Sequence, residues 1–143
     1  PSWISPRWNW VLLITSIGYS TNAETFTQKL EIAKTENKNV LLYFSGSDWC
    51  APCIKFKKFI VNSPEFQAFA TDNLIVYNAD FPRLSKNKLS KEDTKENEAL
   101  AEKYNSKGAF PLILLLDTDG KILKEWDGFP KETVEEFISK LKK

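Results

Sequence analysis

Apolar and polar positions follow two kinds of pattern along this chain, and together they predict strands that alternate with helices. An apolar run of strand length occupies residues 40–44, as expected for a strand covered on both faces, and residues 112–116 form the most hydrophobic predicted strand. Residues 74–80 read as another strand. Amphipathic helices are predicted where apolar residues recur at the spacing of one helical face: 23–37, 54–60, 66–69, 99–104 and 134–141.

Local signals indicate where several of these elements begin or turn. The segment Thr21-Asn22-Ala23-Glu24 has the form of a capping box and predicts the start of the first helix. Ser63 followed by Pro64 predicts an N-cap that restarts a helix after an interruption. Residues 117–120, Asp-Thr-Asp-Gly, predict a hairpin turn that returns the chain through 121–126 as a strand.

The apolar stretch 10–17 has two readings, a strand or the core of a signal peptide, and it is too short to span a membrane. The regular alternation that follows it favours the strand. We therefore expect one domain over 1–143, with 1–20 as an N-terminal extension and first strand. The polar, lysine-rich segment 83–94 is expected to be a surface loop insertion, with a partner-docking loop as the alternative.

Composition narrows the possible partners. The chain has 143 residues, 20 basic and 19 acidic, and a formal net charge of +1, so nothing in it calls for nucleic acid or an anionic membrane. We expect no membrane span and a monomer. The chain contains no methionine, so either an initiator was removed before Pro1 or Pro1 follows a signal or anchor segment.

Both cysteines lie in the segment Trp49-Cys50-Ala51-Pro52-Cys53, between the apolar run 40–44 and an amphipathic segment. A zinc or iron–sulfur site needs about four ligands, and two cysteines without any histidine cannot supply them. A purely structural disulfide would close a short loop and stabilise little. At a helix start the first sulfur meets unpaired N–H groups and the positive end of the helix dipole. Cys50 is therefore the candidate nucleophile and Cys53 the resolving thiol.

With these residues in place, the chain resembles the thioredoxin superfamily over nearly its whole length. The resemblance rests on the Cys motif after the strand 40–44, on Phe110-Pro111 before the strand 112–116, and on the Asp-Gly hairpin followed by a C-terminal helix. Residues 44–50, 79–82 and 97–104 are similar to bacterial exported thioredoxin-like proteins, close to the C-terminal domain of thiol:disulfide interchange reductases. The resemblance to the thioredoxin superfamily implies an α/β thioredoxin fold, a three-layer sandwich with a central mixed β-sheet flanked by helices.

The resemblance also implies roles for residues around the cysteines. Pro111 is expected to form a cis peptide bond beside the dithiol, and Trp49 to shield the nucleophile. The substrate-binding residues that it implies are Trp49, Ala51, Pro52, Phe110 and Pro111.

The chain departs from the family at the position of its buried acid, which Tyr43 occupies, and a partner lysine is matched by Val76. A tyrosine with an ordinary pKa of about 10 is a poor general base near neutral pH. The second thiol step is then slower, or relies on water or Asp48. Leu112 also replaces a threonine common after the cis-proline.

We expect a thiol–disulfide oxidoreductase that needs no cofactor or metal and reduces protein disulfides through Cys50 and Cys53. The expected partners are a disulfide-containing protein substrate and an upstream electron-donor reductase. The alternatives are a disulfide oxidase or isomerase, or a thioredoxin-fold module that binds extended polypeptides and whose dithiol is incidental. A periplasmic or otherwise exported location is preferred, with the cytoplasm as the alternative.

Overall fold

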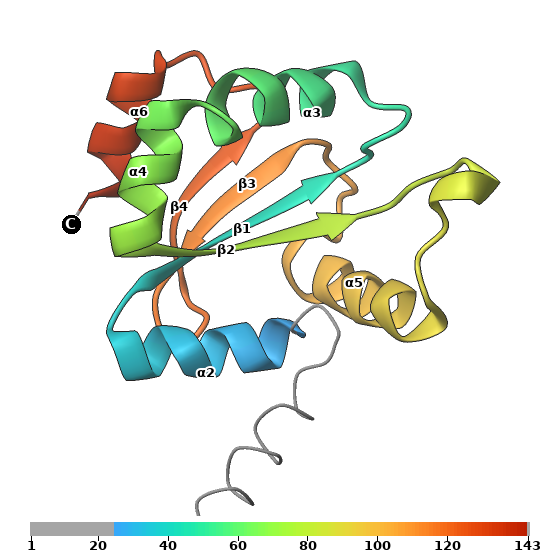
Figure 1. The fold of residues 1–143 in the computed structure, drawn as a ribbon. Coiled ribbons are helices and arrows are strands. Elements are labelled where there is room, and N and C mark those ends of the chain that lie inside the picture. Colours follow the sequence, from blue (N-terminus) through green and yellow to red (C-terminus); the bar gives the residue numbers. More distant parts are fainter. Residues whose placement is uncertain (1–24, 143) are drawn as a thin grey trace, which may run out of the picture.

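The computed structural model describes residues 25–142. The strand expected at 10–17, the extension 1–20 and the capping residues expected at 21–24 lie outside the described residues. Within them, the chain forms a mixed four-stranded sheet with helices on both faces (Figure 1). This confirms the predicted three-layer α/β architecture.

The sheet has the strand order β2-β1-β3-β4. β1 (Asn39–Ser45) runs parallel to β2 (Leu74–Asp80) on one edge and antiparallel to β3 (Leu112–Leu116) on the other. β4 (Ile122–Asp127) pairs antiparallel with β3 through the predicted Asp-Gly turn. The hairpin and the strands 74–80 and 112–116 are therefore confirmed.

In the part of the chain that the structure describes, five α-helices cover the two faces of the sheet. α2 (Phe26–Glu36) and α5 (Lys91–Tyr104) lie on one face, as Figure 1 shows. α3 (Ala51–Phe56), α4 (Pro64–Asn73) and α6 (Val134–Leu141) cover the opposite face. α3 continues into a π-helical segment, Lys57–Val61, and a 3-10 turn, Ser85–Asn87, interrupts the loop after β2.

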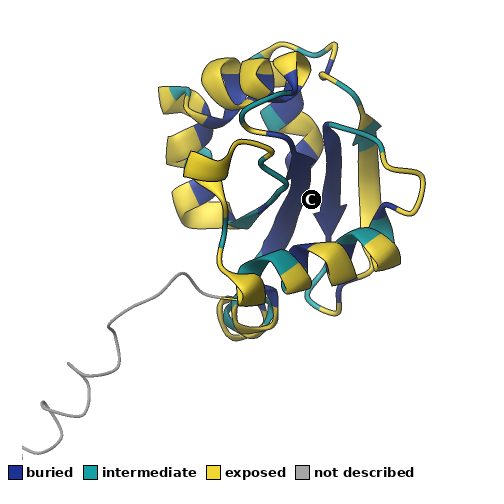
Figure 2. Ribbon diagram, turned by 90° about the vertical axis from the view of Figure 1, so that its right-hand side faces the viewer, coloured by how far each residue is buried: buried dark blue, intermediate teal, exposed yellow. Residues whose placement is uncertain are grey.

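β1 is buried along its whole length and contributes to two hydrophobic cores (Figure 2). Leu41 and Tyr43 pack on the side of α3, α4 and α6. Val40, Leu42 and Phe44 pack on the side of α2 and α5. This alternation explains the continuous apolar run in the sequence, because each face of a central strand meets its own layer of helices.

Two predicted boundaries were wrong. Helix α2 begins at Phe26, since Thr25 and Gln28 close a capping box in which each side chain accepts from the other residue's backbone N–H. Helix α5 begins at Lys91 with Ser90 as its N-cap, so the loop ends there and 91–94 belong to the helix. The first turn of α5 contains no apolar side chain, so apolar spacing does not reveal it.

The core between α3, α4, α6 and the sheet is organised around Phe137. Its ring is fully buried and contacts the rings of Phe56, Phe66 and Trp126, with centroids 5.9, 6.3 and 4.8 Å away. A side chain so enclosed cannot be truncated without leaving a cavity.

We therefore predict that Phe137→Ala lowers the free energy of unfolding by about 3–5 kcal/mol, measured by urea denaturation. Phe129→Ala is the matched control, because Phe129 is 41% exposed and its loss leaves no cavity. We expect the control to cost less than about 1 kcal/mol. Equal losses in the two variants would contradict this account of the core.

Candidate functional site

The two cysteines lie where β1 gives way to α3. Cys50 is the N-cap residue of α3, and the backbone N–H of Cys53 donates to Cys50 Sγ at 3.3 Å. The two are joined as a disulfide, with their Cα atoms 5.2 Å apart. Cys50 keeps 6% of its surface exposed and Cys53 2%, so Cys50 is the more accessible sulfur. The N–H that now contacts Cys50 Sγ is placed to stabilise a thiolate on the same atom.

A tight turn before Cys50 sets the direction in which the chain enters α3. The carbonyl of Gly46 accepts from the N–H groups of Trp49 and Cys50 at 3.1 and 2.8 Å. The Trp49 indole lies directly against Gly46, and a Cβ built at this position would overlap the ring. Glycine is therefore needed at position 46, because a side chain there would prevent the close approach of the Trp49 indole to the backbone.

Trp49 joins two other segments of the chain to this turn. Its Nε1 donates to the carbonyl of Phe81 at 2.7 Å, and its ring meets Phe110 edge-on with centroids 5.3 Å apart. The Phe110–Pro111 peptide bond is cis, as expected. Pro111 is buried, and its carbonyl accepts from the N–H of Gly128 at 2.8 Å. The aromatic contacts thus bring the neighbour of Cys50 together with the residue before the cis-proline.

Ala51 and Pro52 occupy the first turn of α3 and are exposed beside the buried Cys50. Proline is tolerated there because the N–H groups of a first turn have no partner within the helix. All seven residues expected from the sequence at the site lie on the turn before α3, on its first turn, or at the cis bond: Trp49, Cys50, Ala51, Pro52, Cys53, Phe110 and Pro111.

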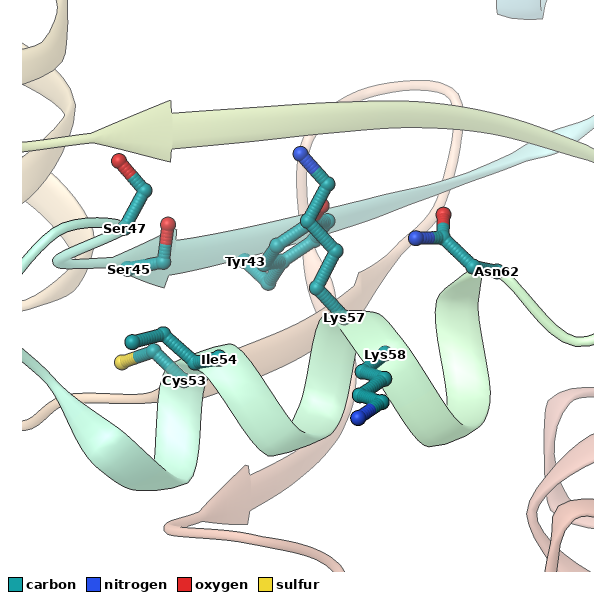
Figure 3. A pocket seen from close by; sticks show the side chains of 8 residues that line it. All are labelled: Tyr43, Ser45, Ser47, Cys53, Ile54, Lys57, Lys58 and Asn62. Carbon is teal, nitrogen blue, oxygen red and sulfur yellow. The ribbon is translucent and has the colours of Figure 1, made fainter. Parts of the chain in front are cut away.

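A cavity of about 200 Å³ opens beside Cys53. Figure 3 shows Lys57 crossing it from the helix, with Tyr43 behind. Burial, and then the negative charge of Asp80, raises the pKa of Tyr43 to about 12. Tyr43 therefore stays protonated at neutral pH and cannot act as a base there. The lining residues are Tyr43, Ser45, Ser47, Cys53, Ile54, Lys57, Lys58 and Asn62.

Asp48, the other base considered from the sequence, is engaged elsewhere. Its carboxylate accepts from the backbone N–H of Arg83 at 2.9 Å, and from Leu84 N–H and Asn87 Nδ2 at 3.0 Å each. These hydrogen bonds, that of Arg83 foremost, lower the pKa of Asp48 below its usual range. The carboxylate fastens the loop after β2 to the turn before Cys50, and it is a weak base.

Sequence reasoning missed Asp80, which ends β2. Its carboxylate accepts from Ser45 Oγ at 3.2 Å and from the backbone N–H of Ser47 at 2.9 Å. It thereby ties the end of β2 to the segment leading to Cys50. The signal was available, because parallel pairing of two equally long strands places Ser45 opposite Asp80.

No group of three or more acidic, cysteine or histidine residues able to hold a metal ion occurs within residues 25–142. None of the helices in this part of the chain is long and apolar enough to cross a membrane.

The sequence model of the Thioredoxin-like domain matches residues 26–143. The chain belongs to the thioredoxin-like family. This thioredoxin-like protein is 36% identical over 119 residues to "Disulfide bond reductase DsbH" of Chlamydia pneumoniae, which covers 83% of this chain and 69% of that protein.

Solved structures agree with this placement. The structure titled "DsbH Oxidoreductase" superposes with a TM-score of 0.74 at 33% identity, over 86% of this chain and 83% of that one. The C-terminal domain of Neisseria meningitidis DsbD in its oxidised form gives a TM-score of 0.52 at 23% identity, over 78% and 84%, and shares the fold. A thioredoxin fold with a Cys-x-x-Cys pair at disulfide distance makes this thioredoxin-like protein a thiol–disulfide oxidoreductase.

The contact between Gly46 and Trp49 leads to one prediction. Gly46→Ala is expected to displace the indole, lower the free energy of unfolding by about 1–3 kcal/mol, and shrink the change in tryptophan fluorescence that accompanies reduction of the disulfide. Gly108→Ala is the matched control: Gly108 has a φ of +71° but open space where a Cβ would lie. In Gly108→Ala the free energy of unfolding should fall by about 1 kcal/mol through backbone strain, and the fluorescence change on reduction should be kept. An unaltered fluorescence change in Gly46→Ala would contradict the contact.

The buried phenol of Tyr43 leads to another. Its pKa is about 12 in the folded protein and about 10 in the unfolded chain, so the unfolded phenol ionises first as the pH rises. The stability due to this group is therefore complete below pH 10 and is lost between pH 10 and 12, by about 2–3 kcal/mol. The free energy of unfolding, measured over that pH range, should therefore decrease less steeply with pH in Tyr43→Phe than in the wild-type protein. The same decrease of the unfolding free energy with pH in both proteins would contradict the prediction.

Proposed function

We propose that this thioredoxin-like protein is a disulfide reductase with Cys50 as its nucleophile and Cys53 as its resolving thiol. The observation that carries the proposal is the position of Cys50 Sγ, which caps α3 and accepts from the N–H of Cys53. The similarity to a protein named a disulfide bond reductase supports this direction of electron flow.

In the first step the Cys50 thiolate attacks one sulfur of a client disulfide. The client S–S bond breaks, a mixed disulfide forms, and the released client thiolate takes up a proton. The N–H of Cys53 and the N-terminal turn of α3 stabilise the attacking thiolate. We assign the exposed first turn, Ala51 and Pro52, together with Trp49, Phe110 and Pro111, to the surface that holds the client.

In the second step Cys53 loses its proton and attacks Cys50 Sγ. The Cys50–Cys53 bond forms, the second client thiolate leaves, and two electrons have passed to the client. Among residues 25–142, no carboxylate lines the cavity beside Cys53, and the Tyr43 phenol is protonated. A cavity of about 200 Å³ has room for water, so we assign the proton's route to solvent within it.

The chemistry between the cysteines also favours reduction. Oxidases and isomerases rely on a strongly stabilised thiolate, whereas the residues here are Ala51 and Pro52, and the chain contains no histidine. A reductase must be re-reduced, so we propose an upstream donor that delivers electrons by the same exchange. The similarity to DsbH supports an exported, periplasmic location.

The reduction potential of the Cys50–Cys53 pair tests the direction. We predict a value near about −270 mV, as in thioredoxin, when the pair is equilibrated with thiol–disulfide buffers at neutral pH. A value above about −180 mV would make the protein an oxidase or isomerase instead. The absence of a reversible transition would leave a binding module.

Cysteine variants test the two roles. Cys50→Ser should abolish reduction of a protein disulfide, a loss of at least about 1,000-fold. Cys53→Ser should still attack and accumulate a mixed disulfide, visible as a covalent adduct that dithiothreitol releases. Accumulation of the adduct in Cys50→Ser would reverse the assignment of the two thiols.

A further inference from the structure

The loop after β2 is fastened beside the dithiol, and one cation on it is held in a fixed place. Asp48, two residues before Cys50, accepts hydrogen bonds from the backbone of Arg83 and Leu84 and from the Asn87 side chain. The same loop is held a second time by the bond from Trp49 Nε1 to the carbonyl of Phe81. The backbone on both sides of Arg83 is therefore tied to the segment that carries Cys50.

The Arg83 side chain lies on the face of Trp49. Its guanidinium carbon is 3.8 Å from the centroid of the indole ring, within the range of a cation–π contact. The Trp49 and Phe110 rings meet in a T-shaped contact, and Phe110 in turn packs against Phe81 with ring centroids 5.6 Å apart. A positive charge thus stands over Trp49, the residue before the nucleophile, and Trp49 itself contacts Phe110, the residue before the cis-proline.

This cation is exposed and has no ion-pair partner in the described structure. Within residues 25–142, no carboxylate oxygen lies within 4.0 Å of a guanidinium nitrogen of Arg83. The segments 45–59 and 81–90 contain Asp48 as their one acid, and its carboxylate is held by the loop backbone. The basic residues of the two segments are Lys55, Lys57, Lys58, Arg83, Lys86 and Lys88.

We propose that Arg83 gives the site a preference for client segments that carry a carboxylate within one or two residues of the disulfide cysteine. The inference rests on the proposed reductase function and adds its substrate class. A residue that near along an extended chain lies about 3–7 Å from the cysteine, which matches a cation placed over the neighbour of Cys50. A planar guanidinium already stacked on a ring can bind a carboxylate, by donating hydrogen bonds to it, with little further loss of side-chain freedom.

Two disulfide-bonded peptides test the proposal. They are identical except that glutamates flank one cysteine in the first and glutamines in the second. The wild-type protein should reduce the glutamate peptide with a kcat/KM about fivefold higher at about 0.02 M ionic strength, and less than about twofold higher at 0.5 M. Arg83→Gln should abolish the preference. Lys86→Gln, which removes the same charge from the same loop without a contact to Trp49, should keep it.

Asp48 is a positioning residue in this account, and Asp48→Asn tests it. The amide keeps the size of the side chain but loses an acceptor for the loop N–H groups. We expect the preference for the glutamate peptide to fall to that of Arg83→Gln although Arg83 is still present. A role in stability alone would slow the reduction of both peptides equally and leave their ratio unchanged.

Several results would overturn the proposal. Equal kcat/KM for the two peptides with the wild-type protein would remove it and leave the reductase function standing. If Lys86→Gln lost the preference to the same extent as Arg83→Gln, the general positive charge of the loop would be its source, and not a specific site at Arg83. If neither peptide were reduced, the proposed function would fail and this inference with it.

Discussion

The placement of the dithiol depends on β1 being held on both edges and both faces. β1 pairs with β2 and β3, and its side chains enter one core at Leu41 and Tyr43 and the other at Val40, Leu42 and Phe44. A strand fixed in this way ends at the same place in every molecule, because sliding by one residue would exchange its two faces. The segment 46–50 then has only a short distance to cover before α3 begins. The core, more than any contact of the turn, determines where Cys50 lies.

The carboxylates of Asp48 and Asp80, near the end of β1, hold neighbouring segments of the chain together. Asp80 ties the end of β2 to Ser45 and Ser47, and Asp48 holds the backbone of the loop after β2. Neither lines the cavity beside Cys53, where Tyr43 stands protonated. Backbone N–H groups and the start of a helix are thus the features placed to stabilise a thiolate on Cys50, the nucleophile of the proposed function. Such groups do not titrate, so they act alike over the whole pH range in which thiols react.

The sequence was most informative where one element carries its own signal. β1 and β3 were predicted because their apolar runs are continuous, and α6 because Val134, Phe137, Ile138 and Leu141 share one face. The start of α5 was missed because its first turns bury no apolar side chain. Ile54 and Phe59 keep helical spacing yet are 46% and 54% exposed, since spacing does not say which face packs. The hydrogen bond that the backbone N–H of Arg83 donates to Asp48 joins residues 35 positions apart and follows only from the fold.

Trp49 is where these constraints meet. The turn before α3, the loop after β2 and the segment before β3 reach it through Gly46, Phe81 and Phe110. Arg83 would be a weak recognition element on a free loop, because an exposed ion pair contributes little and an arginine loses about 2 kcal/mol of rotamer entropy when it is ordered. Here the Asp48 bonds and the indole order it during folding. In the proposed function a client therefore meets a charge that is already in place, and less of the interaction energy is lost to ordering.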